Sequence, residues 1–156
     1  MRSLVLATSF FLATVGGAAF AQPANTPPAH AATQPHDTVQ VVDAFMQALA
    51  NGQLEAARQL MTPDAVVMSN GQVLGARDAY IDGPAKGDAA ALKGTQRELL
   101  NRGVSADTEI GWVISEKKLR DAKGAHELHL TETVLLAKTP AGWKITGIHW
   151  SGRNAG

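Results

Sequence analysis

Cysteine is absent from the 156 residues of the chain. The absence excludes disulfide bonds, thiolate metal sites, iron–sulfur clusters and cysteine nucleophiles, and it excludes a lipoprotein anchored through a lipidated cysteine. Any metal site would have to use Asp, Glu or one of the five histidines. The sequence does not place three such ligands together, so we expect no metal and no cofactor.

An excess of charge is also absent, because 14 Lys and Arg residues balance 14 Asp and Glu residues. A protein that binds a nucleic-acid backbone normally carries a basic surface that neutralises phosphates. We therefore expect no nucleic-acid partner. Familiar catalytic motifs are missing as well, since the sequence contains neither a phosphate-binding loop nor a Gly-x-Ser-x-Gly nucleophile elbow.

The N-terminus has the pattern of a secretory signal peptide. Arg2 precedes an apolar stretch from Leu4 to Val15, and Ala19-Phe20-Ala21 forms a cleavage site of small residues. The alternative is a membrane anchor, but the apolar stretch is short for a span and its C-terminal flank is small. We expect cleavage after residue 21, a periplasmic or secreted mature protein, and no membrane association after cleavage.

Residues 22–36 are predicted to form a disordered linker. Four of the seven prolines lie in this segment, and it shows no apolar periodicity. The folded domain is therefore predicted to span residues 37–153, which is long enough for one modest core.

Apolar spacing predicts helices in the first half of this domain and strands in the second. After the N-cap residue Asp37, the residues Val42, Phe45 and Leu49 fall on one helical face. The segment 95–103 has a helical composition, but the order of elements favours a strand there. The predicted elements are helices over 37–49, 54–61, 75–81 and 85–92, a hairpin over 65–74, and strands over 95–103, 110–115, 127–138 and 143–150. We expect an α+β fold with the helices packed over a curved antiparallel sheet.

Alternation along the last two strands places an acid beside an imidazole. If Lys138 pairs with Trp143 across the connecting loop, Glu132 falls opposite His149 on an otherwise apolar face. Gly147 would leave space near this pair for a ligand. Trp112, Tyr80 and Trp143 are the candidate aromatic walls of a ligand-binding cavity.

The Glu132–His149 pair has several interpretations. It can be a satisfied structural pair, part of a ligand site, or an acid–base pair in which Glu132 is the base and His149 its partner. A metal would need a third ligand that the sequence does not supply. Charged residues near the strand ends are expected to be solvated, among them Lys117, Arg120 and Glu127.

Several motifs together resemble one known family. They are the ending Gly142-Trp143-Lys144-Ile145 with His149-Trp150-Ser151, the preceding Thr131-Glu132-Thr133, and the Asn70-Gly71 hairpin followed by Arg77-Asp78. Over residues 37–152 the chain resembles the SnoaL-like branch of the nuclear transport factor 2-like superfamily.

The resemblance implies a cone-shaped half-barrel, also described as cystatin-like, that encloses a pocket. Related secreted proteins often carry histidines in the segment 82–88, but this chain has none there, which argues against a histidine-based cluster. Asp88 is the one acid of the segment that could face the cavity. The resemblance also implies a homodimer through the outer sheet face. On the predicted register that face carries Thr131, Thr133, Leu135, Thr146, Ile148 and Trp150.

Two functions follow as expectations. The first is a periplasmic protein that binds a small apolar or carbonyl-containing molecule in the barrel, with acid–base chemistry of the isomerase, lyase or cyclase type. The second is a dimerisation or accessory module whose core is filled. A cavity of roughly 300 Å³ or more would favour the first. The sequence alone does not decide whether the protein is an enzyme.

Overall fold

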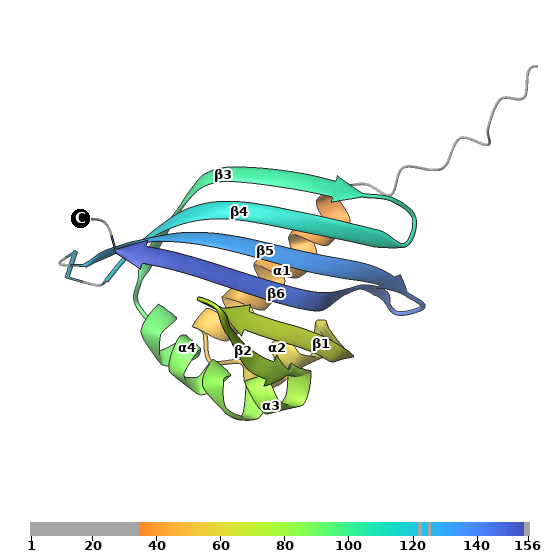
Figure 1. Cartoon of the computed structure of the whole chain (residues 1–156), viewed down its shortest axis with the longest axis horizontal. Coiled ribbons are helices and arrows are strands. Elements are labelled where there is room, and N and C mark those ends of the chain that lie inside the picture. The colour runs from red at the N-terminus through yellow and green to blue at the C-terminus, as the bar shows by residue number, and fades with distance from the viewer. Residues whose placement is uncertain (1–34, 122, 125, 155–156) are drawn as a thin grey trace, which may run out of the picture.

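The computed structural model of the chain describes residues 35–121, 123–124 and 126–154. The predicted signal peptide and most of the predicted linker lie outside these residues. Figure 1 shows helices gathered at one side of a single sheet. The elements are α1 (Pro35–Ala50), α2 (Leu54–Gln59), β1 (Met61–Ser69), β2 (Gln72–Ala76), α3 (Arg77–Asp82), α4 (Pro84–Leu92), β3 (Gln96–Ala106), β4 (Ile110–Arg120), β5 (Glu127–Thr139) and β6 (Gly142–Asn154).

The six strands form one curved sheet in the order β2-β1-β6-β5-β4-β3. All neighbouring pairs are antiparallel except β1 and β6, which run parallel. The predicted α+β class is confirmed. The segment predicted over 95–103 is a strand, because it pairs with β4 along nearly its whole length.

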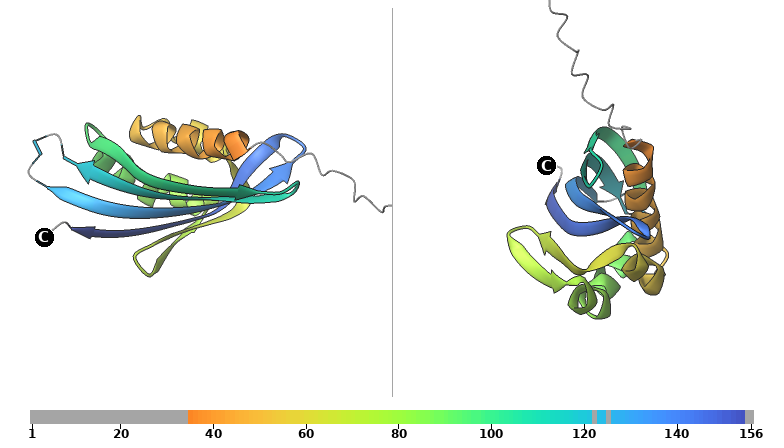
Figure 2. Two further views of the ribbon diagram at one scale, coloured as in Figure 1. Left: turned by 90° about the horizontal axis from the view of Figure 1, so that it is seen from above. Right: turned by 90° about the vertical axis from the view of Figure 1, so that its right-hand side faces the viewer.

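Helix α1 crosses the concave side of the sheet and supplies much of the core (Figure 2). Val42, Phe45 and Leu49 are almost completely buried, as their three- and four-residue spacing predicts. The helix begins at Pro35, two residues before the predicted cap, so Asp37 lies in its first turn. There its charge still complements the positive end of the helix dipole. Gly52, with φ of +70°, follows the helix end in the left-handed conformation that glycine tolerates.

Helices α3 and α4 lie at one end of the barrel, beside the β1–β2 hairpin (Figure 1). They are separated by Gly83, and Pro84 opens α4 at a position where its missing N–H costs nothing. No helix in the described part of the chain is long and apolar enough to cross a membrane.

A β-bulge divides β6 into two parts with opposite facing. Near the loop the predicted register is correct, because Lys138 pairs with Trp143 and Leu136 with Ile145. The next pair is Leu135 with Gly147, so Thr146 is an extra residue on β6. An extra residue reverses the inside–outside alternation of everything that follows it.

The bulge overturns the predicted pairing. Beyond it Glu132 pairs with Trp150, while His149 pairs with Thr133. Ile148 and Trp150 therefore point into the core, where both are buried, and His149 is exposed on the outer face. The predicted Glu132–His149 pair is wrong. The assignment of Ile148 and Trp150 to the outer face is wrong for the same reason.

Candidate active site under the curved sheet

Four neighbouring strands each contribute one polar or aromatic residue to a single row on the concave face. The row runs from Arg102 through Ser115 and Glu132 to Trp150. Ser115 and Glu132 have no exposed surface. Arg102 donates a hydrogen bond to the Ser115 hydroxyl and forms a two-pronged ion pair with Asp43 of α1. A polar line thus crosses the interior of the barrel.

Glu132 is the buried centre of this line, and both of its carboxylate oxygens have partners. Lys117 Nζ lies 2.6 Å from Oε1, and the indole Nε1–H of Trp150 donates to Oε2 over 2.9 Å. The lysine supplies the positive charge that a buried carboxylate requires. Lys117 was predicted to be solvated, but its side chain is only 10% exposed, so that prediction is wrong.

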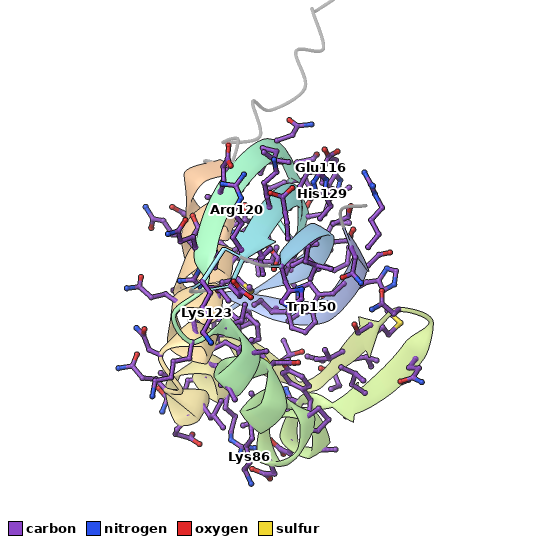
Figure 3. All side chains as sticks on the ribbon, turned by 90° about the vertical axis from the view of Figure 1, so that its left-hand side faces the viewer. Lys86, Glu116, Arg120, Lys123, His129 and Trp150 are labelled. Carbon is purple, nitrogen blue, oxygen red and sulfur yellow. The ribbon has the colours of Figure 1, made fainter. Side chains whose placement is uncertain are left out.

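Trp150 connects the polar row to a cavity. Its indole N–H is held by Glu132, and its side chain contributes to the wall of a cavity of about 330 Å³ between the sheet and α4. Figure 3 shows Trp150 between the strands and α4. Apolar side chains make up much of the remaining wall, namely Met46, Leu49, Leu92, Leu119, Leu128 and Leu130.

Asp88 of α4 brings a carboxylate to this cavity. Its Oδ2 accepts a hydrogen bond of 2.8 Å from the hydroxyl of Tyr80, which is fully buried. Burial, with the charge and hydrogen bond of Asp88 added, raises the pKa of Tyr80 well above its ordinary value. The tyrosine is therefore a fixed donor that orients the carboxylate. The Tyr80 and Trp150 rings are also neighbours, with centroids 6.1 Å apart.

Charged residues from the strand ends line the outer part of the cavity. Arg120 Nε donates to Glu127 over 2.8 Å, and this bond lowers the pKa of Glu127 below its ordinary value. Asp121 and His126 also contribute to the lining. Within the described residues, no group of three or more His, Asp and Glu side chains is placed to hold a metal ion.

This combination of curved sheet, covering helices and lined cavity agrees with the comparison to known families. Residues 39–153 match the SnoaL-like domain, which is most of the chain. The chain belongs to the SnoaL-like family. No curated protein matches the sequence at a significant level.

Solved structures share the fold of this SnoaL-like domain, and several of them are described as nuclear transport factor 2-like. A Shewanella frigidimarina protein provisionally named a ketosteroid isomerase is 26% identical with a TM-score of 0.67, over 72% of this chain and 92% of that one. A Streptomyces avermitilis protein provisionally named a dehydratase from the nuclear transport factor 2-like family is 20% identical with a TM-score of 0.64, over 79% of this chain and 98% of that one. A Nostoc punctiforme protein with a cystatin-like fold is 11% identical with a TM-score of 0.58, over 76% and 90%.

The residues that we predicted to share one site lie in different parts of this SnoaL-like domain. Tyr80 is next to the cavity through Asp88, and Glu132 lies behind Trp150 rather than in the wall. Trp112 and Gly147 lie on the outer face, where Leu135 packs over Gly147. Trp112 is 39% exposed and does not line the cavity.

Trp143, the third predicted aromatic wall, lies before the bulge. It is buried, and Lys138 Nζ lies 5.3 Å from its ring centroid. Its position in β6 is at the end away from Trp150, and it is not among the residues that line the cavity. The two tryptophans of β6 therefore serve different parts of the barrel.

Sequence reasoning missed Lys117 and the role of Trp150 in this SnoaL-like domain. Lys117 falls on the same face of its strand as Val113 and Ser115, two residues apart each time, and this alternation was the available signal. The facing of Trp150 depends on the bulge at Thr146, and the available signal was the adjacent Gly147, because a glycine inside a strand often marks a bulge. Asp88, expected to face the cavity from the family resemblance, does line it.

Proposed function

We propose that this SnoaL-like protein is exported and binds a small, mostly apolar molecule in the cavity beside Trp150 and Asp88. The observation that carries the proposal is the cavity itself. Its volume of about 330 Å³ is in the range of small-molecule sites, and its apolar wall carries a few fixed polar groups. The N-terminal signal pattern supports export, because it combines a positive start, an apolar stretch and a cleavage site.

Asp88 is the group we propose for proton transfer on such a ligand. It lines the cavity, and Tyr80 holds its Oδ2 in place by a hydrogen bond. A positioned carboxylate is a common general base. Two similar structures carry enzyme names, an isomerase and a dehydratase, which supports testing acid–base chemistry. Glu132 has a different role in this proposal, since it positions Trp150.

The binding proposal is tested by filling the cavity from its rim. Ala91 is an exposed residue of α4 that lines the cavity, whereas its neighbour Ala90 is exposed but does not line it. A melting-temperature screen of the mature protein against small metabolites should find compounds that raise the melting temperature, because a ligand of the native state stabilises it. Ala91→Trp should abolish the rise and Ala90→Trp should preserve it. Compounds that act equally on both variants would contradict the proposal.

A second proposal concerns the outer face of the sheet, which we infer to be a homodimer interface. Exposed apolar side chains gather there from the three strands β1, β4 and β5. In the described rows from Val66 to Ser105 and from Met68 to Gly103, the outward residues include no Asp, Glu, Lys or Arg. A twofold axis brings identical patches together, so an uncharged apolar patch is complementary to its own copy. The apolar residues are Val66, Met68, Ile110, Trp112, Ile114 and Leu135.

Sedimentation analysis tests this interface. The mature protein should sediment as a dimer at micromolar concentration. Leu135→Glu, which places a charge at a half-exposed position of the patch, should convert it to a monomer. Ala90→Glu adds the same charge at an exposed residue of α4, on the other side of the sheet, and should leave the dimer intact. A monomeric wild-type protein would overturn the interface and leave the binding proposal standing.

A further inference from the structure

The hydrogen-bond donors of the two aromatic residues beside Asp88 are already in use. Tyr80 gives its hydroxyl proton to Asp88, and Trp150 gives its indole N–H to Glu132. Within the described part of the chain, Oδ1 of Asp88 has no hydrogen-bond partner. This part of the cavity therefore presents an unused acceptor, and a ligand satisfies it only by bringing a donor of its own.

The charges that line the cavity have an acidic balance. Asp88, Asp121 and Glu127 are acidic, and Arg120 is the one Lys or Arg among the described residues of the lining. Arg120 is bound to Glu127 by a hydrogen bond and ion pair, so each offsets the other. Asp88 forms no salt bridge with Lys or Arg among the described residues of the lining. The Lys86 and Lys123 side chains labelled in Figure 3 belong to α4 and the β4–β5 turn, and neither is part of this lining.

Trp150 adds a third property that suits a positive charge. Its ring lines the same cavity to which Asp88 presents its carboxylate. The face of an indole ring attracts cations, and tryptophan is the strongest of the aromatic residues in this respect. Because Glu132 holds the N–H edge, the ring is fixed rather than free to turn away. The Asp88 carboxylate, which has an unused acceptor oxygen, and the fixed indole of Trp150 both favour one kind of ligand.

We propose that the cavity selects small organic cations, with an apolar body and one ammonium group, over neutral or anionic molecules of the same shape. The ammonium donates to Asp88 near the Trp150 ring, and the apolar body packs against the leucines of the wall. This inference rests on the proposed binding function and narrows it to a class of ligand.

Three probes of one shape test the selection: 2-naphthylmethylamine, 2-naphthylmethanol and 2-naphthoic acid. Calorimetric titration of the mature protein should give the amine an affinity about ten- to a hundredfold above that of the alcohol, since hydrogen bonds to charged groups are worth about 1.5–3 kcal/mol. The acid should be weaker still. The advantage of the amine should fall as salt rises, because salt screens a partly exposed ion pair.

Asp88→Asn then identifies the group responsible. The amide oxygen can still accept the Tyr80 hydroxyl, so the fold is preserved while the charge is removed. This variant should reduce the preference for the amine to less than about threefold. Glu116→Gln removes one negative charge from the exposed outer face and should leave the preference unchanged.

The outcomes separate the two proposals. If none of the three probes binds and none of the screened metabolites does either, the binding function fails. If the alcohol or the acid binds as tightly as the amine, the cavity binds ligands but the inference about cations is overturned. That comparison uses wild-type protein alone, so it holds even if a variant does not fold.

Discussion

Two carboxylates lie under the same sheet, and they differ in how completely the protein satisfies them. Glu132 has no exposed surface, and both its oxygens accept bonds from Lys117 and Trp150. Asp88 is half-buried, accepts one bond from Tyr80 and faces a cavity. A carboxylate whose two oxygens both have partners has no acceptor left for a ligand, whereas a carboxylate with one unused oxygen can still accept a hydrogen bond from a ligand. Counting partners therefore distinguishes a supporting carboxylate from a functional one where the residue type does not.

The largest expected effect comes from breaking the saturated site. Lys117→Met should lower the free energy of unfolding by about 3–5 kcal/mol, because it leaves the Glu132 carboxylate buried without its counter-charge. Replacing both residues, as Lys117→Met with Glu132→Leu, should recover most of that loss. Denaturant unfolding measures all three proteins. A loss below about 1 kcal/mol in the single variant would mean that Glu132 is not held as a buried charge.

A smaller loss of stability is expected from changing Trp150, which binds Glu132 and also lines the cavity. Trp150→Phe keeps an aromatic ring in the cavity wall but leaves Oε2 of Glu132 without its donor, so it should cost about 1–3 kcal/mol. It should also weaken ligand binding, because the remaining ring is no longer oriented by Glu132. Trp112→Phe is the matched control on the outer face and should not change binding. If the two substitutions changed ligand affinity equally, the result would contradict a role for Trp150 in the cavity.

Alkaline titration should show how firmly Tyr80 is held beside Asp88. Its pKa is raised in the folded protein, so the folded state keeps the proton that the unfolded state loses above pH about 10. Stability is therefore complete below pH 10 and falls above it, by up to about 1.4 kcal/mol per pH unit. Tyr80 is the only tyrosine, so phenolate absorbance reports this residue alone.

Phenolate absorbance should accordingly appear together with unfolding and not before it. Tyr80→Phe should remove this tyrosine contribution to the alkaline loss of stability. A phenolate signal at pH 10 in protein that is still folded would show that the Tyr80–Asp88 contact is open to solvent.

The smallest change in stability should come from Asp88, the carboxylate with only one hydrogen-bond partner. Asp88→Asn should alter the free energy of unfolding by less than about 1 kcal/mol, because the Tyr80 hydrogen bond survives and the group is partly solvated. Glu132→Gln, the same chemical change at the saturated site, should cost several times more. Thermal and denaturant unfolding of the two variants give the comparison directly. Equal costs would show that the number of partners does not distinguish the two acids.

Most of the fold could be predicted because its signals are local and repeated. The spacing of Val42, Phe45 and Leu49 defines α1, and Asn70-Gly71 defines the first hairpin. The burial of Glu132 also followed from alternation along β5. The identity of its partners did not follow, because alternation on β6 is interrupted at Thr146, and the neighbouring Gly147 was interpreted as space for a ligand although a strand glycine often marks a bulge.

The cavity could not be predicted from local sequence patterns. Its wall joins Met46 of α1, Asp88 of α4 and Trp150 of β6, which are far apart in the chain. Whether side chains fill such a space depends on how tightly α4 packs over the sheet, and this is a property of the assembled barrel. Pattern along the chain predicts which residues face inward, but it does not predict how much room remains between them.

The bulge at Thr146 means that β6 carries two alternative interiors in one stretch of sequence. If Thr146 stayed in the chain but paired with Leu135, the bulge would be lost, the alternation would continue from Ile145, and the following segment would turn over. His149 would then enter the barrel beside Glu132, and Ile148 and Trp150 would pass to the outside. Deletion of Thr146 would instead remove the bulge and keep the present facing, so the two interiors differ in strand register alone.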